Sequence, residues 1–187
     1  MRSAAVGLVL GLALLCGCAP RPSPSGTPPE RALAGLWVPS PPEVIVTMLE
    51  LAAVRPTDVV YDLGSGEGEI VIEAARRYGV RAVGVELDHE RVENAEKKAA
   101  AGGVADRVTF VERDLFDADI SEATVVTLYL FPDLMQRLKP KLLRELRPGA
   151  RIVAHDFGLP GWPPEQTVDV PSDRLRRVYL WTVPSRQ

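Results

Sequence analysis

The stretch DLGSGEGEI, which follows the apolar run VVY, combines residue types that suit the binding of a small molecule. Asp62 opens it, and glycines then stand at every second position: Gly64, Gly66 and Gly68. Because glycine accepts positive φ angles and has no side chain, such a backbone turns tightly and can lie against a ligand. The spacing differs from the G-x-G-x-x-G fingerprint of dinucleotide sites, and Glu67 and Glu69 would repel a pyrophosphate at the start of the next helix. A ligand that offers a cation is better suited to this loop.

Two more acidic residues follow at the ends of later apolar runs. Glu86 ends AVGVE, where it could accept two hydrogen bonds from a ribose diol. Asp114 ends VERD, where its carboxylate could bind an exocyclic amine while the backbone of Leu115 reads a ring nitrogen. With the glycine loop, these residues predict a site for an adenosine whose tail is charged but carries no phosphate.

The elements that would hold these residues alternate between strand and helix. Short β-rich apolar runs predict strands over 59–63, 81–87, 107–114, 123–131 and 150–157. Helical spacing of apolar residues predicts helices over 40–54, 69–79, 89–103 and 132–149. The tail adds two strands that would pair as a hairpin, 166–170 and 176–183. The predicted fold class is α/β, with a doubly wound, mainly parallel seven-stranded sheet, helices on both faces and an antiparallel last strand.

Three of the predicted helices carry local signals. Ser40 as N-cap, followed by Pro41 and Glu43, predicts a capping box for the first helix. Asp88 is placed to cap the third helix. Pro140 interrupts the apolar stripe of the last helix, so two short helices are expected there.

Length and composition narrow the classes of protein. The chain has 187 residues, of which 46% are hydrophobic and 25% charged, and a net charge of -3. These values predict one domain with an appendage and no general nucleic-acid-binding surface. Both cysteines, Cys16 and Cys18, lie near the N-terminus, so neither a disulfide nor a metal site is expected in the folded part.

Residues 1–34 differ in composition from the rest of the chain. Arg2 precedes an uncharged apolar stretch and then small residues, which is the layout of a secretory signal peptide. The motif LCGC resembles a bacterial lipobox with Cys18 as the lipid-bearing residue, which predicts a protein of the bacterial cell envelope, lipid-anchored to a membrane. The expected division is a signal peptide with lipobox (1–18), a proline-rich tether (19–34) and a folded domain (35–187). The alternatives are an uncleaved anchor at the cytoplasmic face of the membrane, or a misassigned start in a cytoplasmic protein.

Three motifs in this order and spacing resemble those of class I S-adenosylmethionine-dependent methyltransferases: VVYDLGSGEGEI, VGVELD and VERDLF. The resemblance extends over residues 37–183 and implies S-adenosylmethionine as the cofactor. It implies that the Asp62 carboxylate lies near the amino-acid end of the cofactor, Glu86 at the ribose and Asp114 at the adenine. The cofactor-site residues implied in this way are Asp62, Gly64, Ser65, Gly66, Glu86, Leu87, Asp114 and Leu115.

A closer resemblance spans most of the domain. The segments WVPSPPEVIVTML, DLGSGEGEIVI, TLYLFPDL and RIVAHDF are similar to bacterial relatives of the mitochondrial lysine methyltransferase that modifies the c-subunit of ATP synthase. This implies N-methylation of a protein lysine, on a membrane-associated partner. Two alternatives stay open. One is a methyltransferase for a small molecule or lipid, with an apolar pocket around Trp37 and Trp162. The other is a non-catalytic envelope lipoprotein that keeps the fold as a binding module.

Methyl transfer to an amine requires a neutral nucleophile, whereas the pKa of a lysine is normally about 10.4. A carboxylate or a desolvating aromatic pocket must therefore assist. The candidates lie at or after the ends of the fourth and fifth strands: Tyr129, Phe131, His155, Asp156 and Trp162. Position favours Tyr129 and Asp156 as the catalytic pair, and packing in the sheet is the alternative role for each candidate.

Two features bear on other partners. The segment LYLFPD differs from the N-P-P-Y type of motif found in methyltransferases that act on nucleobase amino groups, so no nucleic-acid partner is expected. A basic run surrounds the last predicted helix: Arg137, Lys139, Lys141, Arg144, Arg147 and Arg151. A solvated helix face is the default interpretation of such a run, and a docking site for an anionic lipid surface or acidic partner is the alternative.

Overall fold

The computed structural model describes residues 38–185, so the predicted signal peptide, Cys18, the tether and Trp37 lie outside the described residues. The helices of the described part are α2 (Pro42–Leu51), α3 (Glu69–Tyr78), α4 (His89–Ala101) and α5 (Pro132–Glu145). Its strands are β1 (Val59–Leu63), β2 (Arg81–Glu86), β3 (Val108–Glu112), β4 (Val125–Leu128), β5 (Arg151–His155), β6 (Gln166–Pro171) and β7 (Leu175–Thr182).

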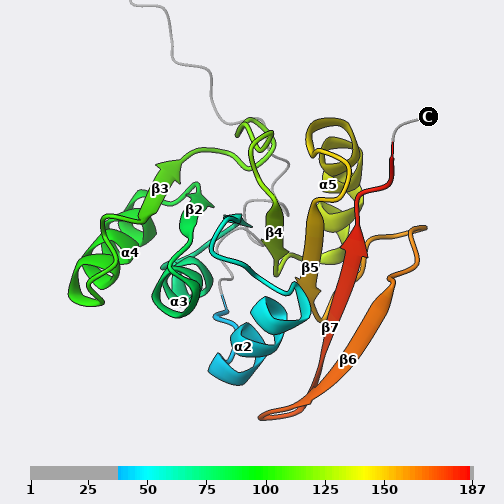
Figure 1. Ribbon diagram of the computed structural model, residues 1–187, viewed down its shortest axis with the longest axis horizontal. Coiled ribbons are helices and arrows are strands. Elements are labelled where there is room, and N and C mark those ends of the chain that lie inside the picture. Colours follow the sequence, from blue (N-terminus) through cyan, green and yellow to red (C-terminus); the bar gives the residue numbers. More distant parts are fainter. Residues whose placement is uncertain (1–37, 186–187) are drawn as a thin grey trace, which may run out of the picture. The chain divides into compact units, whose positions relative to one another are not determined.

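These strands form one seven-stranded sheet in the order β3-β2-β1-β4-β5-β7-β6 (Figure 1). Strands β1 to β5 run parallel, and β7 pairs antiparallel with both β5 and β6. The predicted mainly parallel α/β sheet with an antiparallel last strand is thereby confirmed. Because the parallel strands share one carboxyl edge, their C-terminal ends open on the side where ligands bind in sheets of this kind.

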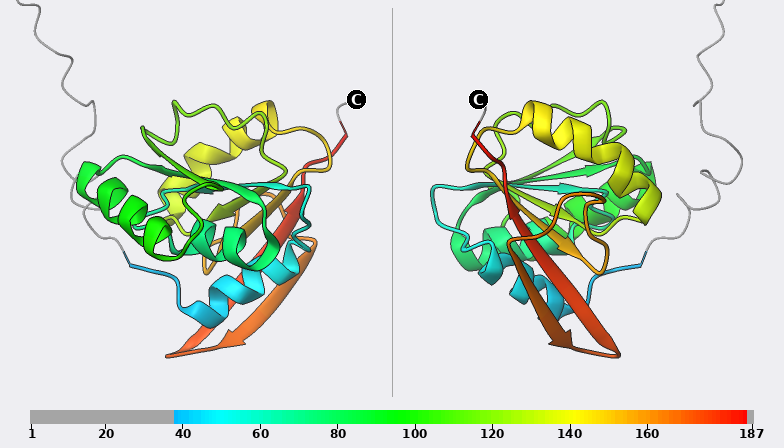
Figure 2. Two further views of the ribbon diagram at one scale, coloured as in Figure 1. Left: turned by 60° about the vertical axis from the view of Figure 1, so that its left-hand side comes forward. Right: turned by 90° about the vertical axis from the view of Figure 1, so that its right-hand side faces the viewer.

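Helices cover both faces of the sheet (Figure 2). On one face, α2, α3 and α4 pack through an apolar cluster that includes Met48 and Val71. On the other face, α5 packs through a second cluster that includes Leu138 and Trp181. Within residues 38–185, no helix has the length and apolar character needed to cross a bilayer.

The capping box predicted for the first helix is wrong. The N-cap position of α2 is held by Pro41, and no side chain caps the helix. The Ser40 hydroxyl instead shares a hydrogen bond of 2.9 Å with Nδ1 of His155, and the Glu43 carboxylate accepts one from Ser172. Both partners are more than a hundred positions away in the chain, so no local pattern could reveal them.

The cap predicted for the third helix is confirmed. The Asp88 carboxylate accepts hydrogen bonds from the backbone N–H groups of Glu90 and Arg91 at the start of α4. At the end of α3, Gly79 has a φ of 65°, a conformation that suits glycine. Strand β4 ends earlier than predicted, so Tyr129 lies just beyond the carboxyl edge of the sheet.

The predicted break at Pro140 is also wrong, because α5 is one helix that contains this proline. Proline cannot donate a hydrogen bond to the carbonyl four residues earlier, and an interior proline costs a helix about 3 kcal/mol. Met135, Leu138 and Leu142 are fully buried on both sides of Pro140. Their packing against the sheet outweighs the local cost.

We expect Pro140→Ala to raise the free energy of unfolding by about 1–2 kcal/mol, because alanine restores the missing N–H in an exposed helix position. Urea unfolding measures the change. Pro132→Ala is the control: Pro132 stands at the start of α5, where the missing N–H has no partner in the helix, so this variant should not be stabilised. Equal behaviour of the two variants would contradict the explanation.

Candidate functional site

The glycine loop between β1 and α3 has the backbone that its sequence requires. Its three glycines have φ angles of 81°, 55° and 84°, a region that other residues rarely adopt: Gly64, Gly66 and Gly68. A Cβ atom on Gly68 would lie 2.6 Å from the Phe110 ring, so the loop also has no room for a side chain there. The amides of Gly64 and Ser65 both donate to the Val85 carbonyl, which bends the loop toward β2.

Asp62, at the end of β1, is a buried carboxyl at the base of this loop. It is 3% exposed, and it accepts a hydrogen bond of 2.8 Å from the Thr127 hydroxyl of β4. Burial raises the pKa of Asp62 to about 7, and the negative charges of Glu69 and Glu86 add to the shift. A positively charged ligand would offset this burial cost, so the carboxyl suits a cationic group.

Glu86, at the end of β2, is held in place by backbone amides. Its Oε2 accepts from the Gly66 N–H at 2.9 Å, and its Oε1 accepts from Leu87 and Asp88 at 2.9 and 3.0 Å. Two carboxylate oxygens can accept about four hydrogen bonds, so capacity remains for a ligand hydroxyl. The amide bonds fix the orientation of the carboxylate next to the loop.

The remaining predicted cofactor residues lie at the same edge of the sheet. Leu87 is 59% exposed, an apolar surface that a bound nucleoside would cover. Asp114 is exposed and accepts a hydrogen bond of 2.9 Å from the Phe116 amide, which orders the turn after β3. Leu115 is partly buried against the α5-side core. Topology therefore gathers all eight predicted residues around the ends of β1, β2 and β3.

Glu67 and Glu69 repel a pyrophosphate less in the structure than their sequence indicates. Lys98 of α4 contacts both carboxylates at 2.6 Å, so they are partly neutralised. The loop amides disfavour a pyrophosphate more strongly. Those of Gly64, Ser65, Gly66 and Gly68 all donate within the protein, so they do not form a phosphate cradle. With Asp62 behind them, the loop fits a cationic tail.

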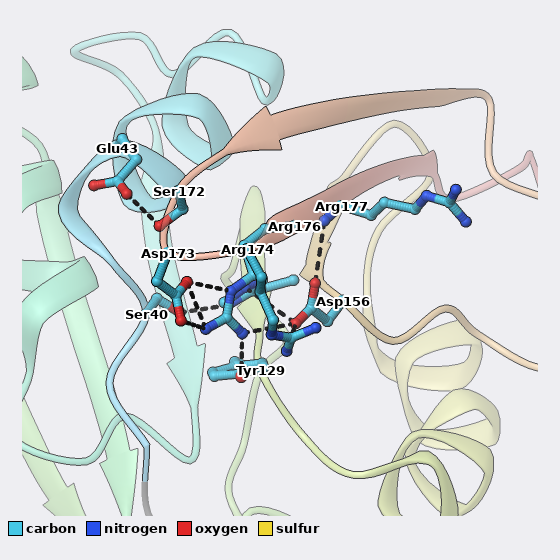
Figure 3. A network of polar contacts seen from close by, with 10 residues as sticks. Ser40, Glu43, Tyr129, Asp156, Ser172, Asp173, Arg174, Arg176 and Arg177 are labelled. Carbon is cyan, nitrogen blue, oxygen red and sulfur yellow. Dashed lines mark hydrogen bonds and ion pairs between the residues drawn. The ribbon is translucent and has the colours of Figure 1, made fainter.

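A polar network lies beyond β4 and β5, on the other side of the glycine loop from β2 (Figure 3). The Tyr129 ring stacks on the His155 ring, with 3.9 Å between centroids. His155 is fully buried, and burial lowers its pKa to about 4, so the imidazole is neutral. Its Nδ1 bonds to Ser40, and its Nε2 lies 3.6 Å from Oδ2 of Asp156.

Asp156 is held in an unusual backbone conformation directly after β5. Its φ is 56°, and the Phe157 amide donates to the His155 carbonyl across it, which makes a three-residue turn. Such strained residues concentrate at functional sites. The Asp156 carboxylate accepts from Arg174 and Arg176 at 2.7 and 3.0 Å and from the Arg177 amide at 3.1 Å.

These contacts set the ionisation of Asp156. Burial by itself would raise the pKa of this carboxyl, but hydrogen bonds from the Arg177 amide and the Arg176 guanidinium outweigh burial and lower the pKa. Asp156 is therefore ionised at neutral pH. Arg176 also donates to Asp173 at 3.0 Å and, at 3.4 Å, to the Tyr129 hydroxyl.

The other two candidate catalytic residues, Phe131 and Trp162, lie in different places relative to this network. Phe131 lies near Phe157, with 6.3 Å between ring centroids, at the rim of this network. Trp162 packs against Trp181 instead, and its carbonyl accepts a hydrogen bond from the Trp181 indole. Sequence reasoning missed four members of the network: Ser40, Asp173, Arg174 and Arg176. The three arginines close together at the start of β7 are visible in the sequence and could have signalled an ionic site. Their carboxylate partners could not be identified from the sequence.

The basic run around α5 is not one solvated face. Lys141 is buried, where its ammonium donates to the Ala118 carbonyl and contacts Glu145. Lys139 donates to the Pro160 carbonyl, and Arg151 pairs with Asp58. These cations hold loops and helix ends in place, which weakens the interpretation of the run as a docking site.

The contribution of the Ser40–His155 hydrogen bond to the stability of the protein can be measured. Ser40→Ala leaves the buried Nδ1 of His155 without its partner, and we expect the free energy of unfolding to fall by about 1–3 kcal/mol. Urea unfolding at neutral pH measures it. Thr47→Ala is the control, because that hydroxyl bonds to a carbonyl of its own helix, on an exposed face. If Ser40→Ala lost no more free energy of unfolding than Thr47→Ala, the stabilising role of the Ser40–His155 hydrogen bond would be contradicted.

The fold and the site together define a class I S-adenosylmethionine-dependent methyltransferase. The chain belongs to the family of the ANTKMT methyltransferase domain, whose family model matches residues 62–166. It is 44% identical to a protein-lysine N-methyltransferase of Saccharolobus islandicus over 79% of this chain and 92% of that one.

Two further comparisons agree on the class. The chain is 34% identical to the ATP synthase c-subunit lysine N-methyltransferase of Xenopus laevis over 76% of its length, and it spans 62% of that relative. A crystal structure described as an RNA methyltransferase from Salinibacter ruber, in complex with S-adenosyl-L-homocysteine, is 53% identical, with a TM-score of 0.77. The match covers 80% of this chain and 96% of that one. S-adenosylmethionine is the cofactor of this class, as predicted.

Proposed function

We propose that this protein N-methylates the side chain of a protein lysine. The observation that carries the proposal is that the ionised Asp156 and the aromatic Tyr129 both contact Arg176, at the sheet edge that also carries the glycine loop. An ammonium group suits both a carboxylate and an aromatic face. The name of the Saccharolobus islandicus relative, of which the chain covers 92%, supports the same acceptor.

The residues of the chain divide into a donor side and an acceptor side. When bound, the cofactor supplies an electrophilic methyl group on a sulfonium. Asp62 and the glycine loop would hold its amino-acid end, Glu86 and Leu87 its ribose, and Asp114 with Leu115 its adenine. On the acceptor side, Tyr129 and Asp156 would orient the lysine nitrogen. The chain then contributes alignment and exclusion of water, which are the main requirements of methyl transfer.

A labelling experiment tests the acceptor. The full-length protein and methyl-labelled S-adenosylmethionine are incubated with extracts of the cells that make the protein. Label in methyl-lysine after protein hydrolysis is the expected result. Label only in the organic phase would favour the small-molecule or lipid alternative, and no label with intact cofactor binding would favour the non-catalytic module.

The same experiment includes an RNA arm. The related Salinibacter ruber structure is described as an RNA methyltransferase, so RNA is the second candidate acceptor. The net charge of -3 does not favour a polyanionic substrate. Label in purified RNA that survives protease but not ribonuclease would replace lysine by RNA as the proposed acceptor.

The proposal includes a lipid anchor at Cys18 and a membrane-associated partner, and the support for both is the sequence of residues 1–34. An anchor would keep the site close to a membrane, where such a partner is concentrated. Cell fractionation with labelled palmitate tests this step. We expect labelled protein in the membrane fraction, and an unlabelled protein in the cytoplasm with its first residues intact would overturn it.

A further inference from the structure

A pocket of about 280 Å³ lies beside the acceptor-side network and has no role in cofactor binding as described above. It is lined by Asp156, Phe157, Arg174, Leu175, Arg177 and Tyr179. Val178 of β7 pairs with His155 at the end of β5, so the first residues of β7 extend past the carboxyl edge of the sheet. The pocket therefore opens on the edge that also carries the glycine loop. Tyr129 lies between the two, since β4 separates β1 from β5.

The lining of the pocket is partly apolar and partly charged. Leu175 is 58% exposed, and Phe157 and Tyr179 are partly buried, so three largely apolar side chains line it. The rest of the lining is the Asp156 carboxylate with Arg174, which pairs with it, and Arg177, which pairs with Asp169. An aliphatic chain that ends in a cation matches this arrangement, because the apolar walls cover the methylene groups while the carboxylate receives the charge.

The two guanidinium groups that pair with Asp156, those of Arg174 and Arg176, differ in burial and in the number of their carboxylate partners. Arg176 has a side chain that is 8% exposed and pairs with Asp173 as well as with Asp156. Arg174 has a side chain that is 59% exposed, and its Nη2 contacts Oδ2 of Asp156 at 2.7 Å. An exposed ion pair of a long side chain contributes little to stability, so Arg174 can leave at low cost while Arg176 stays.

We propose that this pocket binds the alkylammonium side chain of the acceptor, and that the Arg174 guanidinium holds the place of the ammonium until the acceptor displaces it. The inference rests on the proposed lysine methylation and adds the position of the acceptor subsite. Asp156 keeps a cationic partner throughout the exchange, so no buried carboxylate is left alone. Arg174 then points into solvent from the turn between β6 and β7.

Arg176 has a second role in this arrangement. Its guanidinium stays next to the acceptor nitrogen, and a nearby positive charge favours the neutral amine over the ammonium. The ammonium proton leaves to water through the open mouth of the pocket. The nitrogen lone pair then forms the new C–N bond as the bond between the methyl carbon and sulfur breaks, and that electron pair stays on sulfur.

The central experiment compares Arg174→Gln with Arg76→Gln in the full-length protein. Arg76 is a matched control, because its side chain is also 59% exposed and contacts a carboxylate, that of Glu73, at 2.7 Å, but it lies on α3 and does not line the pocket. For a lysine peptide that the wild type methylates, we expect Arg174→Gln to lower KM about two- to fivefold, with kcat and the KM for the cofactor unchanged. Arg76→Gln should leave all three constants as they are, and Arg174→Lys should restore the wild-type KM.

A binding measurement separates this inference from the proposed function. With saturating S-adenosyl-L-homocysteine, n-butylammonium is titrated into wild type and Arg174→Gln, and binding is followed by NMR of the amine. Tighter binding to Arg174→Gln supports the pocket even if no lysine is methylated. Equal binding to both proteins, no binding to either, or a raised peptide KM for Arg174→Gln would overturn the proposal, whether or not wild type methylates lysine.

Discussion

Replacing Asp62 with asparagine is expected to lower the affinity for S-adenosylmethionine by more than about thirtyfold at pH 8, since removal of one partner from a buried charge pair costs about 2–5 kcal/mol. Asparagine keeps the shape of the side chain and can still accept the Thr127 hydrogen bond. The loss would therefore come from the charge. Isothermal titration calorimetry of the two proteins measures it.

The pH dependence of binding gives the same test a second readout. The pKa of Asp62 is about 7 in the ligand-free protein, and a cationic ligand favours the ionised form. Binding to wild type should therefore release a proton below pH 7, and affinity should rise about tenfold between pH 6 and pH 8. In Asp62→Asn this part of the pH dependence should disappear.

Protein stability distinguishes lost binding from misfolding. The folded-state pKa of Asp62 lies above its unfolded value, so its contribution to stability is present at low pH and is lost as pH rises through about 7. Asp62→Asn avoids burying this charge and should be at least as stable as wild type at pH 8 without cofactor. Asp119→Asn changes a surface carboxylate and serves as the control. Wild-type affinity in Asp62→Asn would contradict the role assigned to Asp62.

Glu86→Ala is expected to weaken cofactor binding by about 10- to 150-fold, because hydrogen bonds to a charged group contribute about 1.5–3 kcal/mol. The carboxylate also accepts the Gly66 amide, so its loss would loosen the loop as well. Glu86→Gln should not rescue binding. Backbone N–H groups face both carboxylate oxygens, and a side-chain NH2 group would meet one of them.

The ribose itself can be probed. Wild type should bind S-adenosyl-L-homocysteine more tightly than its 2′-deoxy analogue, and Glu86→Ala should bind the two about equally. Glu112→Ala is the control, since Glu112 is the register partner of Glu86 on β3 but pairs with His89 at the surface. If Glu86→Ala still discriminated between the two ligands, the ribose would be held by another group.

Much of the arrangement around the glycine loop follows from local sequence. The apolar runs are short and β-rich, the helices between them have regular spacing, and this alternation forces parallel strands with a common carboxyl edge. Residues placed at strand ends, such as Asp62, Glu86 and Asp114, must then meet at that edge. The three glycines have positive φ angles for the reason that their spacing suggested.

The polar network around Asp156 depends on contacts that local sequence cannot show. Ser40 meets His155 across 115 positions, and the arginines at the start of β7 meet Asp156 only because the terminal hairpin folds back beside β5. The same holds for Lys98, which partly neutralises two glutamates that the sequence alone presented as repulsive.

By itself, then, the sequence determined the α/β sheet, the conformation of the glycine loop and the order in which the acidic residues at the strand ends occur, because these depend on propensity, periodicity and strand alternation. Only the tertiary structure decided that Ser40 supports His155 instead of a helix, that α5 continues through Pro140, and that Arg174 and Arg176 share Asp156. The physical reason is the same in each case. Burial and charge pairing between distant segments outweigh local preferences of about 1–3 kcal/mol, and the partners are known only once the chain is folded.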